Sequence, residues 1–176
     1  LEPKFLRFPG GCVTEGYTLD LAYNWKDSIG VGKDGEPLNF GGTYGHIAAR
    51  KQGQNIWTDE RSTNDPYPSY MSYGLGFYEY FLLAEDLGAL PVPVVNCGMR
   101  CMAQGTGADP ALGSDEFQSY IQDALDLVEF CRGDLSTKWG AVRVAMGHPA
   151  PFQLKYIGIG NENWGSKFFS RYTAFM

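Results

Sequence analysis

The sequence predicts an α/β fold in which parallel strands alternate with helices. Three short apolar runs are separated by segments with helical periodicity, and a further helix begins after the third run. Alternation of this kind gives parallel strands joined by right-handed crossovers. A doubly wound sheet and a closed barrel both fit this pattern. We expect residues 1–176 to belong to one domain.

The first predicted strand covers residues 5–8 and ends at the turn residues Pro9, Gly10 and Gly11. The segment from about Ile29 to Tyr73 follows, rich in Gly, Asn, Asp, Pro and Ser and without sustained periodicity. Loops of this length are usually functional or disordered. We therefore expect a long functional or disordered loop there.

A helix is predicted for residues 75–87, where Gly88 ends it, and a strand for residues 92–95. The proline at position 93 is placed near the start of that strand, where a missing N–H is tolerated. The third strand is predicted for residues 154–159. An aromatic stretch after it, which includes Phe168 and Tyr172, opens another helix.

The clearest predicted element is a helix over residues 115–132. Ser114 is a good N-cap, acidic residues fill the first turn, and Gly133 ends the helix. Apolar residues recur at helical spacing, so we expect one face to be buried. The residues on this expected face are Phe117, Tyr120, Ile121, Ala124, Leu125, Val128 and Cys131.

Composition excludes several kinds of partner. A net charge of −6 and a pI near 4.8 argue against nucleic acid, which needs clustered Lys and Arg. No apolar run approaches the roughly 18 residues of a membrane-spanning helix, so we expect no membrane partner. Aromatic residues make up 15% of the chain, and we expect most of them, including most tryptophans, in the core. The alternative is that some line a ligand-binding cleft, and composition does not choose between the two.

The four cysteines do not have the spacing of a zinc site, because Cys97 and Cys101 stand alone as a pair and both histidines are distant in sequence. If the protein is secreted, four cysteines allow three disulfide pairings, among which the sequence does not choose. We expect free thiols, with Cys131 buried in its helix.

Polar residues follow the predicted strands. Arg7 and Cys12 come at or after the first strand, Asn96 after the second, and Asn161 and Glu162 after the third. The carboxyl ends of parallel strands share one face of the sheet, where α/β enzymes keep their chemistry. Glu162 beside Asn161 suits a general acid/base next to a hydrogen-bonding group for substrate.

A nucleotide-binding loop is the rival interpretation of residues 158–163. The run begins like a G-x-G-x-x-G fingerprint, but Asn163 replaces the last glycine and Glu162 would lie against a pyrophosphate. We reject this interpretation.

Five ordered blocks resemble the α-L-arabinofuranosidases of glycoside hydrolase family 51. Together with the segments between them, they extend over nearly the whole chain except about residues 31–72. The blocks are KFLRFPGGC at 4–12, YNWKDSIG at 23–30, GLGFYEY at 74–80, MGHP at 146–149 and YIGIGNENWG at 156–165.

The resemblance implies part of a (β/α)8 TIM barrel, approximately strands 2 to 4 with their helices. It implies a retaining exo-hydrolase that removes terminal L-arabinofuranose from plant polysaccharides. Glu162 would be the acid/base and Asn161 would bind the sugar 2-hydroxyl. The other expected substrate-binding residues are Arg7, Cys12, Asn96 and Trp164. The long loop at about residues 31–72 departs from the shorter loops of the family, so the resemblance does not predict the aglycone preference.

Two family carboxylates have no match in this chain. The resemblance places a substrate-contacting glutamate before Leu1 and the nucleophile after Met176, so we expect the chain alone to be inactive. Glu15, Glu79 and Glu85 are expected to be structural. No cofactor or metal is implied, because two carboxyls suffice for this chemistry.

Three further expectations concern the whole protein. The alternative functions are another retaining barrel glycosidase and a carbohydrate-binding protein that has lost catalysis. The chain shows no signal peptide, and a secreted or periplasmic location is favoured slightly over a cytoplasmic one. The sequence is compatible with a parent protein that forms a homo-oligomer.

Overall fold

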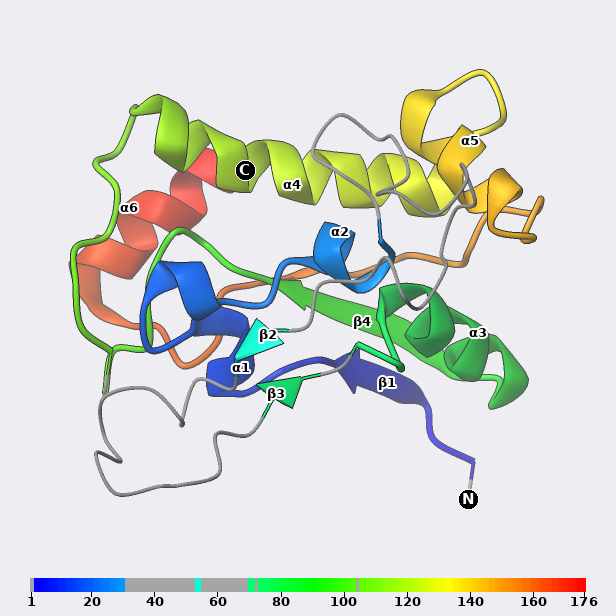
Figure 1. Cartoon of the computed structure of the whole chain (residues 1–176), viewed down its shortest axis with the longest axis horizontal. Helices are drawn as coiled ribbons and strands as arrows, with labels where there is room; N and C mark the ends of the chain where they lie inside the picture. Colours follow the sequence, from blue (N-terminus) through cyan, green and yellow to red (C-terminus); the bar gives the residue numbers. More distant parts are fainter. Residues whose placement is uncertain (1, 31–52, 55–69, 72, 104) are drawn as a thin grey trace.

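The computed structural model describes residues 2–30, 53–54, 70–71, 73–103 and 105–176. A parallel sheet runs through it in the order β1 (Phe5–Phe8), β4 (Leu90–Val95), β5 (Gly158–Ile159). Arg7 pairs with Val92, and Val95 pairs with Ile159. The predicted α/β class with parallel strands is confirmed. The arrowheads of β1 and β4 point to the same end of the molecule (Figure 1).

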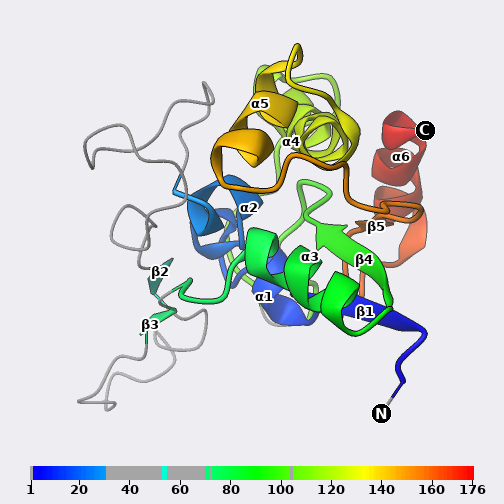
Figure 2. The same ribbon diagram turned by 90° about the vertical axis from the view of Figure 1, so that its right-hand side faces the viewer.

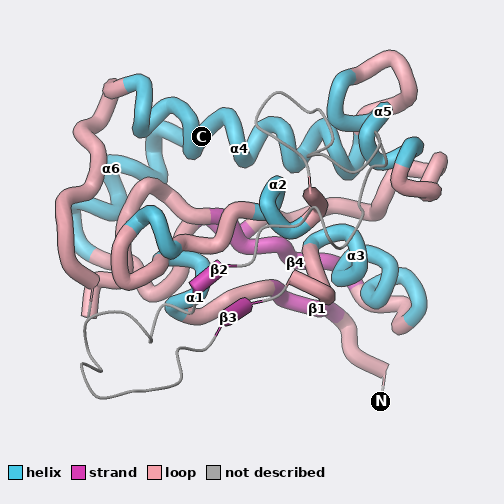
Figure 3. The backbone as a smooth tube through the Cα atoms, viewed as in Figure 1, coloured by secondary structure: helices cyan, strands magenta, loops and turns pink. Residues whose placement is uncertain are grey.

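Helices connect and follow the strands, and in Figure 3 α4 runs above β4 while β1 lies along the lower side of the molecule. Helix α3 leads into β4, helices α4 and α5 separate β4 from β5, and α6 follows β5. Figure 2 shows α3 and the α4–α5 pair as separate layers beside the sheet. Their bounds are α3 (Phe77–Asp86), α4 (Asp115–Arg132), α5 (Lys138–Ala145) and α6 (Gly165–Phe175).

Short elements fill the connection between β1 and α3. Three of them are single turns that follow β1 directly, and two form an antiparallel pair. They are α1 (Cys12–Glu15), η1 (Leu19–Leu21), α2 (Trp25–Ser28), β2 (Gly53–Gln54) and β3 (Tyr70–Met71). Most of the predicted long loop at 29–73 lies outside the described residues.

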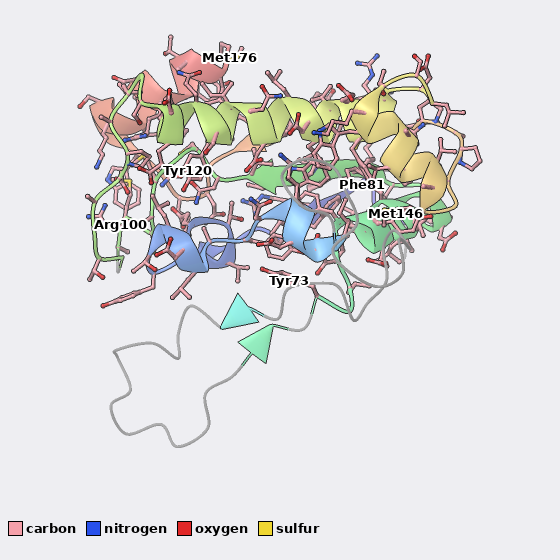
Figure 4. All side chains as sticks on the ribbon, turned by 45° about the horizontal axis from the view of Figure 1, so that its top comes forward. Tyr73, Phe81, Arg100, Tyr120, Met146 and Met176 are labelled. Carbon is pink, nitrogen blue, oxygen red and sulfur yellow. The ribbon has the colours of Figure 1, made fainter. Side chains whose placement is uncertain are left out.

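The core is built mainly from aromatic rings. Phe81 of α3 lies against Phe8 at 5.1 Å and Phe152 at 4.9 Å between ring centroids, and it lies between the sheet and the helices in Figure 4. Trp25 packs on Trp139 at 5.0 Å. Such pairs add roughly 0.5–1.5 kcal/mol each beyond burial of area. Burial of these rings bears out the expectation that most aromatic residues in the described part are core.

Helix α4 begins and ends as predicted, because both signals are local. Ser114 Oγ accepts from Phe117 N at 3.1 Å, and Gly133 follows the last residue. The buried face differs from the predicted one, since Leu125 is 57% exposed and Val128 36%. The buried face instead carries Phe117, Ala124, Leu127, Phe130 and Cys131.

Two other elements differ from the predictions. Strand β5 is only two residues long, because only Gly158 and Ile159 pair with β4. Before it, Phe152 N donates to Cys131 O at 2.8 Å. Helix α5 was not predicted. It is capped by Thr137 Oγ1, which accepts from Gly140 N at 3.2 Å, and it buries Trp139 and Arg143. The aromatic stretch after β5 does form a helix, α6.

Within the described part of the chain, no helix combines the length and apolarity needed to span a membrane.

Candidate active site

Arg7 lies at the carboxyl end of β1, where a tight turn follows it. Gly10 has φ +64°, and a Cβ there would lie 2.1 Å from Arg7 Nη1. A residue with a side chain would therefore be strained and would also displace the guanidinium. The turn needs this glycine so that the backbone can pass under Arg7.

Asn161 is the residue on which the site converges. It is 6% exposed, and its Oδ1 accepts from Arg7 Nη2 at 2.6 Å and from Gly11 N at 3.1 Å. Its Nδ2 donates to Glu15 Oε2 at 3.3 Å. Because both ends of the amide have defined partners, the orientation of Asn161 is fixed by residues from β1 and α1.

Glu15, which was expected to be structural, contacts the residues of this site. Its side chain lies in helix α1, is 1% exposed, and also accepts from Asn163 Nδ2 at 2.9 Å. Burial raises the pKa of Glu15, donation from Asn161 and Asn163 opposes this, and the Glu162 charge adds to the rise. Glu15 thus holds the residues on both sides of Glu162.

Glu79 and Glu85 make contacts outside the site. Glu79 Oε2 accepts from Gly76 N at 2.8 Å at the start of α3. Glu85 Oε2 lies 2.9 Å from His148 Nε2. Both positions fit the structural roles that were expected.

Glu162 lies at the apex of the turn after β5. Its φ of +46° is in the left-handed region, which costs a non-glycine residue of order 1–3 kcal/mol. The turn is held by Gly160 N, which donates to Val95 O at 2.7 Å, and by Asn161 N, which donates to Asn163 Oδ1 at 2.9 Å. Neighbouring hydrogen bonds therefore hold the strained backbone that carries the exposed Glu162 side chain beside Asn161.

Cys12 lies in the same group. Its side chain is partly buried at the start of α1, next to Gly11, which donates to Asn161. Burial, the Cys101 thiol, and the charges of Glu15 and Glu162 raise the pKa of Cys12 to about 11. The sequence-predicted residues Arg7, Cys12, Asn161 and Glu162 are thus brought together in the structure.

Asn96 is near this group, but its side-chain amide is hydrogen-bonded to backbone atoms. Its Nδ2 donates to Thr14 O at 2.9 Å and Glu15 O at 3.3 Å, and its Oδ1 accepts from Gly98 N and Met99 N. Its side chain is also buried. In this arrangement Asn96 anchors α1 to the loop after β4, and its hydrogen-bonding capacity is filled.

Trp164 offers a ring to solvent beside the turn. It is 56% exposed, and its backbone N donates to Met102 Sδ at 3.3 Å. Of the other tryptophans, Trp25 and Trp139 are buried, while Trp57 lies outside the described residues. Trp164 is therefore the indole in the described part that is free to stack on a ligand.

A cavity of about 540 Å³ lies elsewhere, between the η1–α2 segment and α4. Its lining includes Asn96 but not Arg7, Asn161 or Glu162. Near it, buried Lys26 pairs with Asp123 at 2.6 Å and Asp126 at 2.5 Å, which ties α2 to α4. The cavity is thus distinct from the site formed by Arg7, Asn161 and Glu162.

Comparison with known proteins decides the family. All of residues 1–176 match the family described as Alpha-L-arabinofuranosidase 1 domain. The chain belongs to this family. Glu162 and its hydrogen-bonded neighbours therefore lie in an α-L-arabinofuranosidase domain.

Relatives support the assignment over nearly the whole chain. An extracellular exo-α-L-arabinofuranosidase of Streptomyces chartreusis is 36% identical over 99% of this chain and 19% of its own length. α-L-Arabinofuranosidase 2 of Arabidopsis thaliana is 38% identical over 93% of this chain and 20% of its own. The chain thus spans about a fifth of the length of these curated relatives.

Solved structures agree with the fold. The arabinose-bound MgGH51 α-L-arabinofuranosidase matches with a TM-score of 0.69 and 29% identity, over 99% of this chain and 23% of that one. The family 51 enzyme of Xanthomonas axonopodis pv. citri matches in fold, with a TM-score of 0.59 and 24% identity, over 96% of this chain and 27% of that one.

Proposed function

We propose that this chain supplies the acid/base part of a retaining, exo-acting α-L-arabinofuranosidase. The observation that carries the proposal is that Arg7 and Glu15 fix the side chain of Asn161 by hydrogen bonds, next to Glu162 at the carboxyl end of β5. In a barrel hydrolase, chemistry belongs at this end of the strands. The names of the relatives support arabinofuranose as the sugar removed.

We further propose that β1, β4 and β5 are strands 2 to 4 of a (β/α)8 barrel, so that residues 1–176 form part of the catalytic domain. Both outer strands of the sheet have an edge without a partner in the described chain. Large apolar side chains are also exposed, including Phe5 at 62%, Tyr156 at 61% and Phe169 at 64%. Neighbouring strands and helices of a complete barrel would cover such surfaces.

In the proposed reaction, Glu162 protonates the oxygen of the leaving group and then deprotonates the water that releases the sugar. Asn161 Oδ1 is occupied by Arg7 and Gly11, and one N–H of its amide is directed to Glu15. Its second N–H is the donor that we assign to the 2-hydroxyl of the sugar. Trp164 gives an exposed apolar face for the substrate.

The nucleophile must come from another carboxyl about 5–5.5 Å from the acid/base. Glu15 does not suit this role, because it is 1% exposed and both of its oxygens accept amide hydrogens. From the resemblance to family 51, we propose that the nucleophile follows Met176 in the parent protein. Residues 1–176 alone should not hydrolyse arabinofuranosides, and turnover by the purified chain above a Glu162→Gln control would contradict this.

We propose arabinose-containing plant polysaccharides, such as arabinan and arabinoxylan, as substrates. A secreted or periplasmic location is proposed from the extracellular Streptomyces relative. Homo-oligomerisation of the parent remains a prediction.

A panel of nitrophenyl glycosides tests the function in the full-length protein. We expect turnover of the α-L-arabinofuranoside to exceed that of β-linked pyranosides by at least about a hundredfold. A difference of roughly 3 kcal/mol in transition-state binding between the two sugars is enough to give this ratio. Preference for a pyranoside would instead identify another retaining glycosidase. Binding of arabinosides without hydrolysis of any substrate would identify a carbohydrate-binding relative.

A further inference from the structure

Two cysteines that are far apart in sequence meet beside the acid/base turn. Cys12 begins helix α1, and Cys101 lies in the loop after β4. The Cys101 and Cys12 Sγ atoms are 3.7 Å apart. The loop that carries Arg100 and Cys101 lies at the end of the molecule opposite Met146 (Figure 4). Both thiols are free.

The backbone on both sides of this contact is already fixed. Cys101 N donates to Gly16 O at 2.9 Å, and Gly16 N donates to Cys12 O at 2.8 Å. Gly105 N also donates to Cys101 O at 2.7 Å. The two segments are therefore held side by side by hydrogen bonds, and the sulfur atoms need to approach only from 3.7 Å to about 2.05 Å to form a bond.

A structural zinc site is the other arrangement that two close thiols suggest. In the part of the chain that the structure describes, Glu15 adds one carboxylate oxygen within 4.8 Å of both sulfurs. Structural zinc takes four ligands, and the Glu15 oxygens already accept hydrogens from Asn161 and Asn163. Oxidation needs only the two sulfurs, so the geometry favours a disulfide.

We propose that Cys12 and Cys101 form an oxidative modification site, where a disulfide closes next to Asn161 and lowers arabinofuranosidase activity. The oxidant is a low-molecular-weight organic disulfide. The Cys12 thiolate attacks one of its sulfurs and expels a thiolate that takes up a proton. Cys101 then loses its proton, and its sulfur displaces the second small thiol from Cys12. Two protein thiols lose two electrons in total, and one small disulfide becomes two thiols.

Cys12 is the first nucleophile because it is the more accessible of the two, whereas Cys101 is only 3% exposed. Burial, the Cys101 thiol and two neighbouring carboxylates raise the pKa of Cys12 to about 11. Little thiolate is present at neutral pH, so the reaction is slow there and becomes faster as the pH rises.

The effect on activity follows from the position of Cys12, and this part rests on the proposed function. Cys12 is preceded by Gly11, whose N–H fixes Asn161, and Glu15 of the same short helix holds Asn161 and Asn163. A bond from Cys12 to Cys101 removes the S–H group of Cys12 as a hydrogen-bond donor and constrains α1. We expect kcat/KM to fall about tenfold, the effect of one lost hydrogen bond of about 1.4 kcal/mol.

The test treats the full-length protein with excess glutathione disulfide and then maps its disulfide-linked peptides by mass spectrometry. We expect a Cys12–Cys101 linked peptide, lighter by two hydrogens than the separate peptides. We also expect a tenfold loss of kcat/KM, as above, that dithiothreitol reverses. Cys101→Ser should retain its basal activity and form no such linkage. After treatment with the oxidant, this variant should show no loss of activity that dithiothreitol can reverse. The control Cys131→Ala, which alters a buried thiol in α4, should behave like the wild type.

Other outcomes are decisive. Glutathione mixed disulfides at Cys12 without the linked peptide would overturn the proposal, as would a linked peptide with unchanged kcat/KM. If the linked peptide forms in a protein that hydrolyses no arabinofuranoside even when reduced, the disulfide chemistry stands while the control of activity and the proposed function fail.

Discussion

Arg7 Nη2 donates to Asn161 Oδ1 at 2.6 Å, across 154 positions of sequence. This contact joins the end of β1 to the turn that carries Glu162. A charge-assisted hydrogen bond of this kind is shorter and stronger than a neutral one. It gives Asn161 an orientation that the backbone of its own turn does not supply.

Arg7→Ala should therefore lower kcat/KM for arabinofuranosides. Removing a hydrogen bond to a charged group costs about 1.5–3 kcal/mol, which is roughly a 10- to 150-fold loss. Steady-state kinetics of the full-length variant give the measurement. Arg132→Ala, at the end of α4, is the control and should leave kcat/KM within about twofold of the wild type. Equal kinetics for both variants would remove Arg7 from the site.

Glu15→Gln tests the inner support of the same turn. One carboxylate oxygen becomes an NH2 group, which then faces an amide donor of Asn161 or Asn163. The mismatch should cost about 1–3 kcal/mol of transition-state stabilisation, roughly 5- to 150-fold in kcat. Because the change also removes a buried charge, the melting temperature should stay within a few degrees of the wild type.

The control for this variant is Glu116→Gln, on the exposed first turn of α4. Kinetics and thermal unfolding are measured on both variants. Should Glu15→Gln unfold at a much lower temperature and retain normal kcat below that temperature, Glu15 is a structural residue and does not position Asn161.

Asp109 joins the loop after β4 to α6, and we expect this contact to be sensitive to acid. Its side chain is 1% exposed and lies 2.5 Å from Lys167 Nζ and 3.1 Å from Arg100 Nη1. Burial acts to raise its pKa, but donation from Lys167 and Arg100 outweighs this, so the pKa is lowered from 3.8. The folded state therefore binds this proton less readily than the unfolded state, and the stability from Asp109 is lost as the pH falls below 3.8.

Asp109→Asn should lower the free energy of unfolding by about 1–3 kcal/mol near neutral pH, with less difference from the wild type in acid. Denaturant unfolding across this pH range provides the measurement. Asp86→Asn, at the exposed end of α3, is the control. A constant difference between Asp109→Asn and the wild type at all pH values would contradict the lowered pKa.

Local signals made parts of the fold predictable from sequence. Helix α4 has its N-cap, acidic first turn and terminal glycine within its own segment, so its bounds were predicted correctly. The prediction of its buried face was partly wrong, because tertiary packing decides whether Leu125 or Leu127 is covered. Strand β5 is shorter than predicted, since strand length depends on pairing with β4.

The site was predictable where polar residues follow strands, as for Arg7, Asn161 and Glu162. Glu15 was expected to be structural, but its contacts with Asn161 and Asn163 were not predictable, because these partners lie 146 and 148 positions away and no local pattern connects them. The pairing of Cys12 with Cys101, 89 positions apart, was hidden for the same reason. One signal was available, because Glu15 lies in the glycine-rich turn region that follows Arg7.

Glu162→Ala in the full-length protein tests whether Glu162 is the acid/base. Arabinosides with poor leaving groups need the proton, so their turnover should fall by roughly 10²–10⁴-fold. Aryl arabinosides with activated leaving groups should be cleaved with a much smaller loss in the first step. Glu116→Ala is the matched control.

The most direct measurement is turnover of the activated aryl arabinofuranoside by Glu162→Ala with and without azide. We predict that azide restores turnover and yields arabinofuranosyl azide, because it attacks the glycosyl-enzyme without needing a general base. An equal loss on activated and poor leaving groups, with no rescue by azide, would contradict the assignment of Glu162 as the acid/base.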